Sequence, residues 1–147
     1  MNNMQHNNTE APVPYDIQSP DTVRTDILTA MPYAYHEKRG IDIEIRQPEF
    51  TSVCPMTGLP DYGSIIITYR PDRHIVELKS LKFYLLQYRN VGIFYEHVVN
   101  KILEDINRVI TPERIVVKGE FTARGGITAN ITAAADTGTE GNDHELA

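Results

Sequence analysis

Tryptophan is absent from the sequence, and cysteine occurs only once, as Cys54, in 147 residues. A single cysteine excludes an intrachain disulfide and any metal or iron–sulfur site built from several cysteines. No apolar run approaches the roughly 18 residues that indicate a membrane-spanning helix. The first residues lack the basic and apolar regions of a secretory signal. We therefore expect a cytoplasmic protein in a reducing compartment.

Basic residues are missing from both ends of the chain. All 14 lysines and arginines lie between positions 22 and 132, where they face 13 of the 20 acids. This near-balance does not fit a general nucleic-acid binder, which needs a broad cationic surface, so no direct nucleic-acid binding is expected. Residues 68–90 form the one locally basic segment, and such a segment suits a small anionic ligand such as a phosphate.

The same ends set the expected domain limits. Residues 1–21 are rich in Asn, Pro and Asp, and residues 133–147 are acidic and rich in small residues. Both compositions are typical of disordered tails. Residues 22–132 are expected to form a single domain, which the chain length also favours.

The hydrophobic pattern inside this domain changes period twice. Alternating and β-branched segments predict strands, and apolar residues spaced three and four apart predict helices. Strands are predicted at about 41–45, 64–69, 75–77, 114–121 and 127–132, and helices at about 81–88 and 98–110. Residues 49–53 either extend the first strand or begin a second piece. The main order is β-β-α-α-β-β, which indicates an α+β fold with an antiparallel sheet and two helices on one face. Such a small sheet has open edges, so a homo-oligomer is expected.

Cys54 lies in a loop rich in Pro and Gly that directly follows a predicted strand. Asp61 stands at the far end of the same loop, which can fold back and bring the carboxyl group close to the sulfur. A nucleophile and a proton donor are the minimum for adding a thiol across a multiple bond. Two plainer alternatives stay open. A lone cysteine is commonly a small buried apolar residue, and Asp61 is equally well explained as a turn former.

Lys79 and Lys82 are predicted to share a face at the start of the first helix. The helix macrodipole opposes cations there, so an anion bound jointly by the ammonium groups and exposed amides would explain them. A solvated helix face is the plainer alternative. Arg124, followed by two glycines, is a third candidate for gripping a phosphate, although the same residues are typical of a tight β-turn.

Glu96 opens the second predicted helix. Its carboxylate can accept two parallel N–H bonds from an edge like that of guanine, while Phe94 and Tyr95 offer stacking surfaces. The alternatives are a first-turn glutamate that favours the helix N-terminus and, for at least one of the two rings, core packing. The five histidines lack metal-ligand spacing, so no metal is expected.

Taken together, three segments resemble one family, the NADPH-dependent 7-cyano-7-deazaguanine reductases of queuosine biosynthesis, or QueF nitrile reductases. Residues 52–61 are similar to the family's nucleophile loop, residues 77–84 to its NADPH-binding signature, and residues 89–96 to its substrate-binding stretch. The match runs from about residue 33 to residue 132 and is similar to the single-module members. One departure is Tyr95, which stands where the family usually has a histidine.

This resemblance implies the tunnelling fold (T-fold), in which β-β-α-α-β-β subunits join into homo-oligomeric rings with active sites at subunit interfaces. It also implies a reaction, the NADPH-dependent reduction of 7-cyano-7-deazaguanine to 7-aminomethyl-7-deazaguanine. The Cys54 thiolate, favoured by local lysines, would attack the nitrile to form a thioimide, and Asp61 would protonate the nitrogen. The implied substrate-binding residues are Val76, Glu77, Leu78, Tyr95 and Glu96, and the implied cofactor-binding residues are Lys79, Lys82 and Arg124.

Two alternatives of other classes stay open. The first is a T-fold hydrolase acting on a purine or pterin ring, similar in architecture to GTP cyclohydrolases. Such an enzyme usually needs a metal or histidine cluster, for which the sequence shows no spacing. The second is a non-catalytic oligomeric ring in which Cys54 is merely buried.

Overall fold

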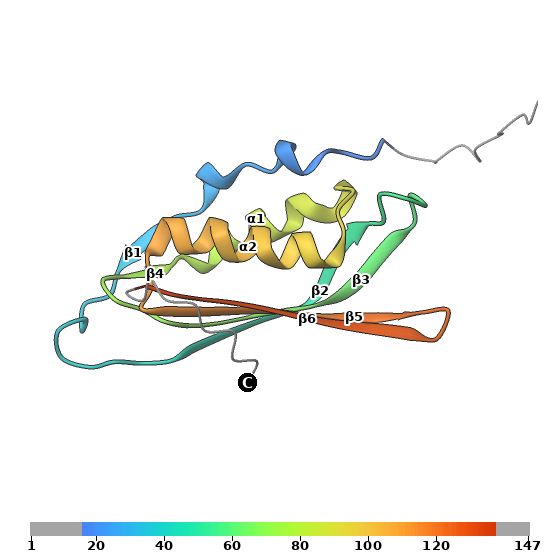
Figure 1. Ribbon diagram of the computed structural model, residues 1–147. Coiled ribbons are helices and arrows are strands. Elements are labelled where there is room, and N and C mark those ends of the chain that lie inside the picture. Colours follow the sequence, from blue (N-terminus) through green and yellow to red (C-terminus); the bar gives the residue numbers. More distant parts are fainter. Residues whose placement is uncertain (1–15, 138–147) are drawn as a thin grey trace, which may run out of the picture.

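The computed structural model describes residues 16–137, in which two helices cover one face of a four-stranded antiparallel sheet (Figure 1). The strand order is β2-β3-β5-β6. These strands are β2 (Ile43–Val53), β3 (Pro60–Arg70), β5 (Arg114–Arg124) and β6 (Ile127–Asp136), and the helices are α1 (Leu78–Leu86) and α2 (Tyr95–Ile110). The predicted α+β class and the β-β-α-α-β-β order are confirmed.

Smaller elements complete the fold. The predicted strand near residue 75 is β4 (His74–Val76), and it pairs with β1 (Ala30–Pro32), which the sequence pattern did not indicate. Three 3₁₀ turns were also not foreseen: η1 (Pro20–Thr22), η2 (Thr25–Ile27) and η3 (Gln87–Asn90). Each is too short for a hydrophobic period to develop, so it forms where tertiary neighbours hold it.

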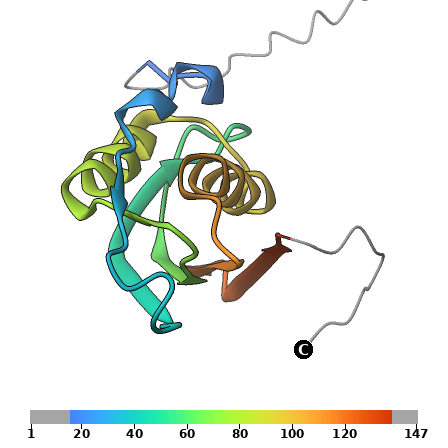
Figure 2. The same ribbon diagram turned by 90° about the vertical axis from the view of Figure 1, so that its left-hand side faces the viewer.

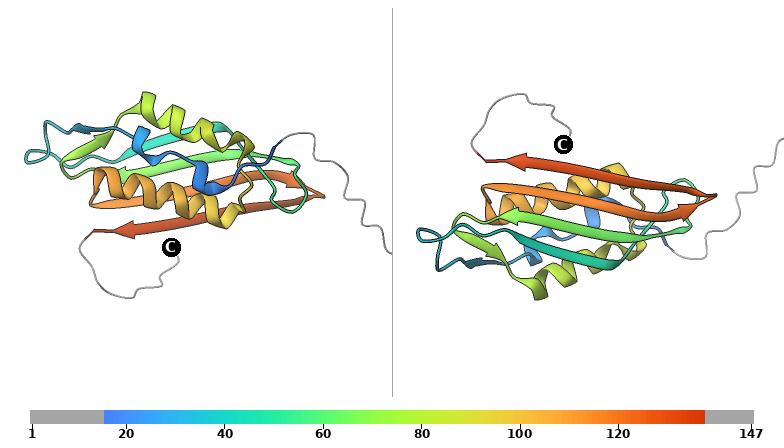
Figure 3. Two further views of the ribbon diagram at one scale, coloured as in Figure 1. Left: turned by 90° about the horizontal axis from the view of Figure 1, so that it is seen from above. Right: turned by 90° about the horizontal axis from the view of Figure 1, so that it is seen from below.

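The core lies between the sheet and the helices, as the end-on view shows (Figure 2). Odd-numbered residues of β3 and β5 point to the helices, for example Ile65, Ile67 and Val117, each with no exposed surface. The apolar stripe of α2 packs onto them from Val98 to Ile110. Seen from below, no helix of residues 16–137 lies across the other face of the sheet (Figure 3). In the described part of the chain, no helix is long and apolar enough to cross a membrane.

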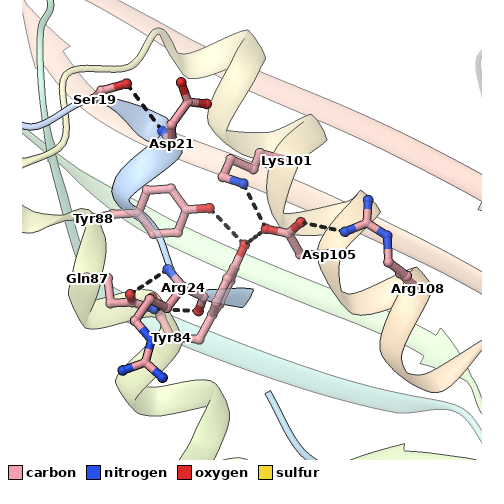
Figure 4. Close-up of polar contacts among 9 residues, drawn as sticks. All are labelled: Ser19, Asp21, Arg24, Tyr84, Gln87, Tyr88, Lys101, Asp105 and Arg108. Atoms are coloured by element: carbon pink, nitrogen blue, oxygen red, sulfur yellow. Dashed lines mark hydrogen bonds and ion pairs between the residues drawn. The ribbon is translucent and has the colours of Figure 1, made fainter. Parts of the chain in front are cut away.

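A buried polar cluster joins the two helices (Figure 4). The Tyr84 hydroxyl donates to Asp105 Oδ2 at 2.6 Å and lies 2.8 Å from the Tyr88 hydroxyl. Lys101 Nζ lies 3.2 Å and Arg108 Nη1 3.7 Å from the Asp105 carboxylate. Burial raises the pKa of both tyrosines, and the Asp105 carboxylate raises it further. Both tyrosines therefore remain neutral hydroxyl groups. Asp105, only 3% exposed, has a hydrogen-bond or ion-pair partner at each carboxylate oxygen.

The segment before β1 lies over the helices as an ordered strap, defined here as residues 16–28. Gln18 forms a parallel bridge to Val91, with Gln18 N donating to Asn90 O at 2.7 Å. The Gln87 amide pairs with both backbone groups of Arg24 at 2.8 and 3.0 Å (Figure 4). The predicted disordered tail of residues 1–21 is thus wrong for 16–21, because backbone hydrogen bonds fix them. Residues 1–15 lie outside the described part.

The C-terminal limit also needs correction. β6 continues through Asp136, four residues beyond the predicted domain end at 132. Residues Ala133–Asp136 pair with β5, and Thr137 N donates to Glu113 O at 3.0 Å. A run of small residues carries no strand signal of its own, so pairing with β5 decides its conformation. Residues 138–147 lie outside the described part.

Candidate active site

The cysteine loop is a closed turn at the end of β2. Cys54 N donates to Leu59 O, and Gly58 N donates to Cys54 O, both at 2.9 Å. Gly58 has φ of 69°, a left-handed conformation that glycine adopts without strain. The loop expected from its Pro and Gly content is thereby confirmed, and its backbone bonds hold the cysteine in place.

Backbone pairing brings this loop beside the start of α2. Val53 N donates to Val91 O at 3.0 Å, and Ile93 N donates to Val53 O at 3.1 Å. The Gly92 backbone lies so close to the strap that an added Cβ would stand 2.7 Å from a methyl carbon of Ile17. Residues 91–93 are therefore held between the strap and β2, and Cys54 comes to lie near the residues that open α2.

One pocket of about 280 Å³ gathers half of the ten residues predicted for catalysis and binding. Cys54 is partly exposed at this pocket, so it is not a buried apolar residue. The pocket is lined by Cys54, Pro55, Thr57, Leu59, Asp61, Phe94, Tyr95, Glu96 and Arg124. Five predicted residues from three parts of the chain thus meet at one concave surface. In the part of the chain that the structure describes, no three His, Cys, Asp or Glu side chains form a metal-binding group.

The surroundings of Cys54 favour its thiolate. Burial raises the pKa of the thiol, but hydrogen bonds from the Thr57 hydroxyl and from the amides of Thr57 and Met56 outweigh this, so the pKa lies below its ordinary value. The negative charge of Asp61 acts in the opposite direction. Within residues 16–137 no lysine contributes to this shift, and the donors of the loop itself favour the thiolate.

Asp61 is a buried strand residue and not a turn former. It is the second residue of β3, lies opposite Ser52 and is 4% exposed. Its Oδ1 receives a hydrogen bond from the Tyr95 hydroxyl at 2.9 Å and lies 2.7 Å from Arg124 Nε. A buried carboxylate with such partners is held in one orientation.

Arg124 reaches Asp61 through an irregularity in β5. Odd positions of β5, such as Val117 and Phe121, face the helices, so regular alternation would point Arg124 to the other face. The pairing with β6 shifts register between Phe121 and Arg124, and such a bulge re-aims the following side chain. Gly125 and Gly126, with φ of 56° and 80°, then close the hairpin, which confirms the predicted tight turn.

Tyr95 is fixed by an aromatic stack. Its ring lies on the Phe121 ring with centroids 3.8 Å apart and planes 10° apart. Phe121 packs tightly against Gly63 and Gly119, where an added Cβ would stand 2.9 Å or less from the phenyl ring. The core packing expected for one of the two rings is therefore confirmed for Tyr95. Burial and the hydrogen bond to Asp61 raise the pKa of Tyr95, which keeps it a hydroxyl donor.

Glu96 and Phe94 remain accessible at the same pocket. Glu96 lies in the first turn of α2, as predicted, and its carboxylate makes no hydrogen bond or ion pair within residues 16–137. Phe94 precedes the helix and is 44% exposed, with an edge-on contact to His97. An exposed acceptor beside an exposed ring is a suitable surface for a flat, N–H-bearing ligand.

Other predicted residues do not line this pocket within one chain. These are Val76, Glu77, Leu78, Lys79 and Lys82. Glu77 caps α1, its carboxylate accepting from the amides of Lys79 and Ser80 at 2.7 Å each, and these bonds lower its pKa. Exposed amides at this helix start were expected to help bind an anion. This is wrong for the amides of Lys79 and Ser80, because both donate to the Glu77 carboxylate.

Sequence analysis did not single out two residues that shape the site. Thr57 lowers the pKa of Cys54, and Phe121 supports Tyr95. Thr57 was detectable as a hydroxyl donor three residues from the cysteine in a turn-forming segment. Phe121 had no local signal, because its contact with Tyr95 joins residues 26 positions apart.

Comparisons with known proteins agree on one family. A family model described as QueF-like protein matches residues 60–140. The NADPH-dependent 7-cyano-7-deazaguanine reductase of Chlorobaculum tepidum is 55% identical over 96 residues, which cover 65% of this chain and 82% of that protein. The chain belongs to the QueF family.

Other QueF relatives extend the match along the chain. The reductase of Chlorobium luteolum is 50% identical over 112 residues, covering 76% of this chain and 96% of that protein. The reductase of Caldicellulosiruptor bescii is 48% identical over 119 residues, covering 81% and 90%. The family resemblance inferred from three sequence segments is thereby confirmed.

A solved structure supports the fold of this QueF member. The crystal structure of the archaeosine synthase QueF-Like in the apo form aligns with a TM-score of 0.58, covering 65% of this chain and 92% of that one. Its sequence identity is 20%, so the likeness concerns the fold alone. The expected T-fold is confirmed.

Proposed function

We propose that this protein reduces 7-cyano-7-deazaguanine to 7-aminomethyl-7-deazaguanine with NADPH, through a thioimide on Cys54. The observation that carries the proposal is the pocket in which Cys54, Asp61 and Glu96 meet. Nitrile addition needs a thiolate, a proton donor and a group that holds the ring, and each of these residues meets one requirement.

The first step forms one bond and moves one proton. The proton that leaves the Cys54 thiol passes to the Asp61 carboxylate. The sulfur then bonds to the nitrile carbon while Asp61 gives this proton to the nitrile nitrogen, leaving a neutral thioimide and a carboxylate. Thr57 and the loop amides supply the thiolate by lowering the pKa of Cys54. Two NADPH molecules, bound one after the other, would each supply one hydride, which together account for reduction of the thioimide to the amine and release of the Cys54 sulfur.

The pocket also suits the ring of the substrate. Glu96 would accept the two N–H groups of the guanine-like edge, since its carboxylate has no partner among residues 16–137. Phe94, 44% exposed, would cover the ring face. Val76, Glu77 and Leu78 lie elsewhere in this chain, so in this proposal a neighbouring copy in a homo-oligomeric ring brings them to the site. The backbone groups around Glu77 would then assist, because its carboxylate already caps α1.

The cofactor phosphates are assigned to Lys79, Lys82 and the outer nitrogens of Arg124. Both lysines are exposed on α1, and neither forms an ion pair in the described part of the chain. The nearest approach of Arg124 to Asp61 is through Nε, at 2.7 Å, and its side chain is 38% exposed, so the guanidinium group can also bind a phosphate. These donors fit the charge of NADPH.

The direct test combines mass spectrometry with an NADPH assay. Enzyme mixed with the nitrile in the absence of NADPH should gain the mass of the substrate at Cys54, and NADPH absorbance should fall only when the nitrile is present. Cys54→Ala should abolish both signals. Full activity of Cys54→Ala would rule out the thioimide. Metal-dependent ring hydrolysis would favour the hydrolase alternative, and neither activity would favour a non-catalytic ring.

A further inference from the structure

The two oxygens of the Asp61 carboxyl group have different surroundings. Oδ1 is contacted by the Tyr95 hydroxyl at 2.9 Å and by Arg124 Nε at 2.7 Å. Oδ2 has no hydrogen bond with any residue between 16 and 137, and Asp61 lines the pocket that holds Cys54. Oδ2 therefore keeps its capacity to form a hydrogen bond with a ligand in this pocket.

This asymmetry decides where a proton can reside. A protonated carboxyl group has one O–H donor and one carbonyl acceptor. A proton on Oδ1 would face a guanidinium and displace the hydrogen bond from Tyr95, so Oδ1 is the carbonyl oxygen. We infer that Tyr95 and Arg124 are positioning residues that confine the transferable proton of Asp61 to Oδ2, the oxygen available to the nitrile. This inference rests on the proposed function of the same site.

Both positioning residues are themselves held in place. The Tyr95 ring is stacked on Phe121, and Phe121 lies directly opposite Gly63 on β3, two residues from Asp61. Arg124 is turned toward Asp61 by the register shift in β5. Tyr95 and Arg124 therefore reach Asp61 from α2 and β5, while the backbone of Asp61 is fixed in β3. Side chains locked in this way keep a catalytic group aligned.

The step that depends on this arrangement is the addition to the nitrile. The Cys54 sulfur supplies the electron pair for the new C–S bond, one π bond of the nitrile breaks, and its nitrogen takes the proton from Oδ2. Asp61 is left as a carboxylate, which Arg124 and Tyr95 both stabilise through Oδ1. No electron is gained or lost, so the step proceeds without NADPH and can be measured alone.

The experiment compares two reactions of the same sulfur in the full-length protein. Addition of 7-cyano-7-deazaguanine without NADPH, followed by mass spectrometry, requires the proton, whereas alkylation by iodoacetamide requires only the thiolate. Tyr95→Phe removes the hydroxyl and keeps the stack, and Arg124→Gln removes the cation. The matched controls are Tyr62→Phe, an exposed tyrosine beside Asp61, and Arg114→Gln, which is paired with Asp136 at the other end of β5.

Tyr95→Phe and Arg124→Gln should each slow addition at saturating nitrile by about tenfold or more, the range for a lost hydrogen bond to a charged group. The half-saturating nitrile concentration and the alkylation rate should change by less than about twofold, because neither residue shifts the pKa of Cys54. Both controls should match the wild type. In an Asp61→Asn background, Tyr95→Phe should cause no further slowing, since it acts through Asp61.

Three results would overturn the inference. The first is wild-type addition rates in both variants, which would leave Arg124 a cofactor ligand only. The second is a parallel fall in addition and alkylation, which would mean that the whole pocket is distorted. The third is an additive effect of Tyr95→Phe in the Asp61→Asn background. No adduct on the wild-type protein is a different result, which would reject the proposed function and this inference with it.

Discussion

Glu77 and Ser80 are joined at the start of α1 by a 2.7 Å hydrogen bond, in which the Ser80 amide donates to the Glu77 carboxylate. The Lys79 amide binds the other oxygen at the same distance. A carboxylate of the protein itself thus occupies the two amides that would otherwise receive a phosphate. An anion at this helix start would therefore have to be bound without these two amides, and the side chains of Lys79 and Lys82 are the charged donors nearby.

This arrangement predicts how the two lysines affect NADPH. Lys79→Ala and Lys82→Ala should each raise the NADPH KM by roughly tens of fold, since a charge-assisted bond to phosphate contributes about 1.5–3 kcal/mol. The salt dependence of KM should also weaken. Steady-state assays measure both effects, with Lys38→Ala as a control in an exposed loop. An unchanged NADPH KM in both variants would assign the lysines to a solvated helix face.

Asp61→Asn tests proton transfer directly. The substitution keeps the shape of the side chain but removes the acidic proton, so turnover should fall by about 10²-fold or more, within the usual range for general acid catalysis. The thermal midpoint of unfolding should be measured alongside, because the ion pair with Arg124 is lost as well. Asp72→Asn, in an exposed turn, is the matched control. An Asp61→Asn enzyme as active as the wild type would place the acid elsewhere.

Thr57→Val should make Cys54 less reactive near neutral pH. The Thr57 hydroxyl stabilises the thiolate and so lowers the pKa of Cys54. Without that hydroxyl the pKa of Cys54 rises, so a smaller fraction of the thiol is ionised at neutral pH. The curve of alkylation rate against pH therefore moves to higher pH. Iodoacetamide alkylation followed against pH measures the shift. Thr57→Ser keeps the hydroxyl and should retain the wild-type profile. If the profiles of Thr57→Val and the wild type coincide, the backbone amides alone stabilise the thiolate.

Tyr84→Phe should destabilise the fold and leave the chemistry intact. It removes the 2.6 Å bond to Asp105 and the 2.8 Å contact with Tyr88 in a fully buried cluster. The expected loss is about 1–3 kcal/mol in the free energy of unfolding, the range for leaving a buried polar group unpaired. Urea unfolding measures it, with exposed Tyr62→Phe as the control. Equal midpoints for both variants would show that water or a rearranged Asp105 replaces the lost donor.

Local sequence determined the elements and the loop that carries the nucleophile. The stripe from Val98 to Ile110 predicted α2, which ends after Ile110, where Thr111 adopts a left-handed φ of 44°. Pro and Gly around Cys54 predicted a loop after a strand, and the structure shows this loop closed by backbone hydrogen bonds. These features depend on neighbours a few residues apart, so periodicity and turn chemistry are sufficient to find them.

Only the tertiary structure decided what each site residue contacts. Arg124 was predicted to bind a phosphate, yet its Nε lies 2.7 Å from Asp61 Oδ1. A register shift in β5 turns the side chain to the inner face of the sheet, and no residue pattern predicts that shift. Tyr95 meets Asp61 across 34 positions of sequence, and Ala133–Asp136 are a strand only because β5 pairs with them. Contacts of this kind arise from strand register and helix packing, which a single sequence specifies through the whole fold and not through any local segment.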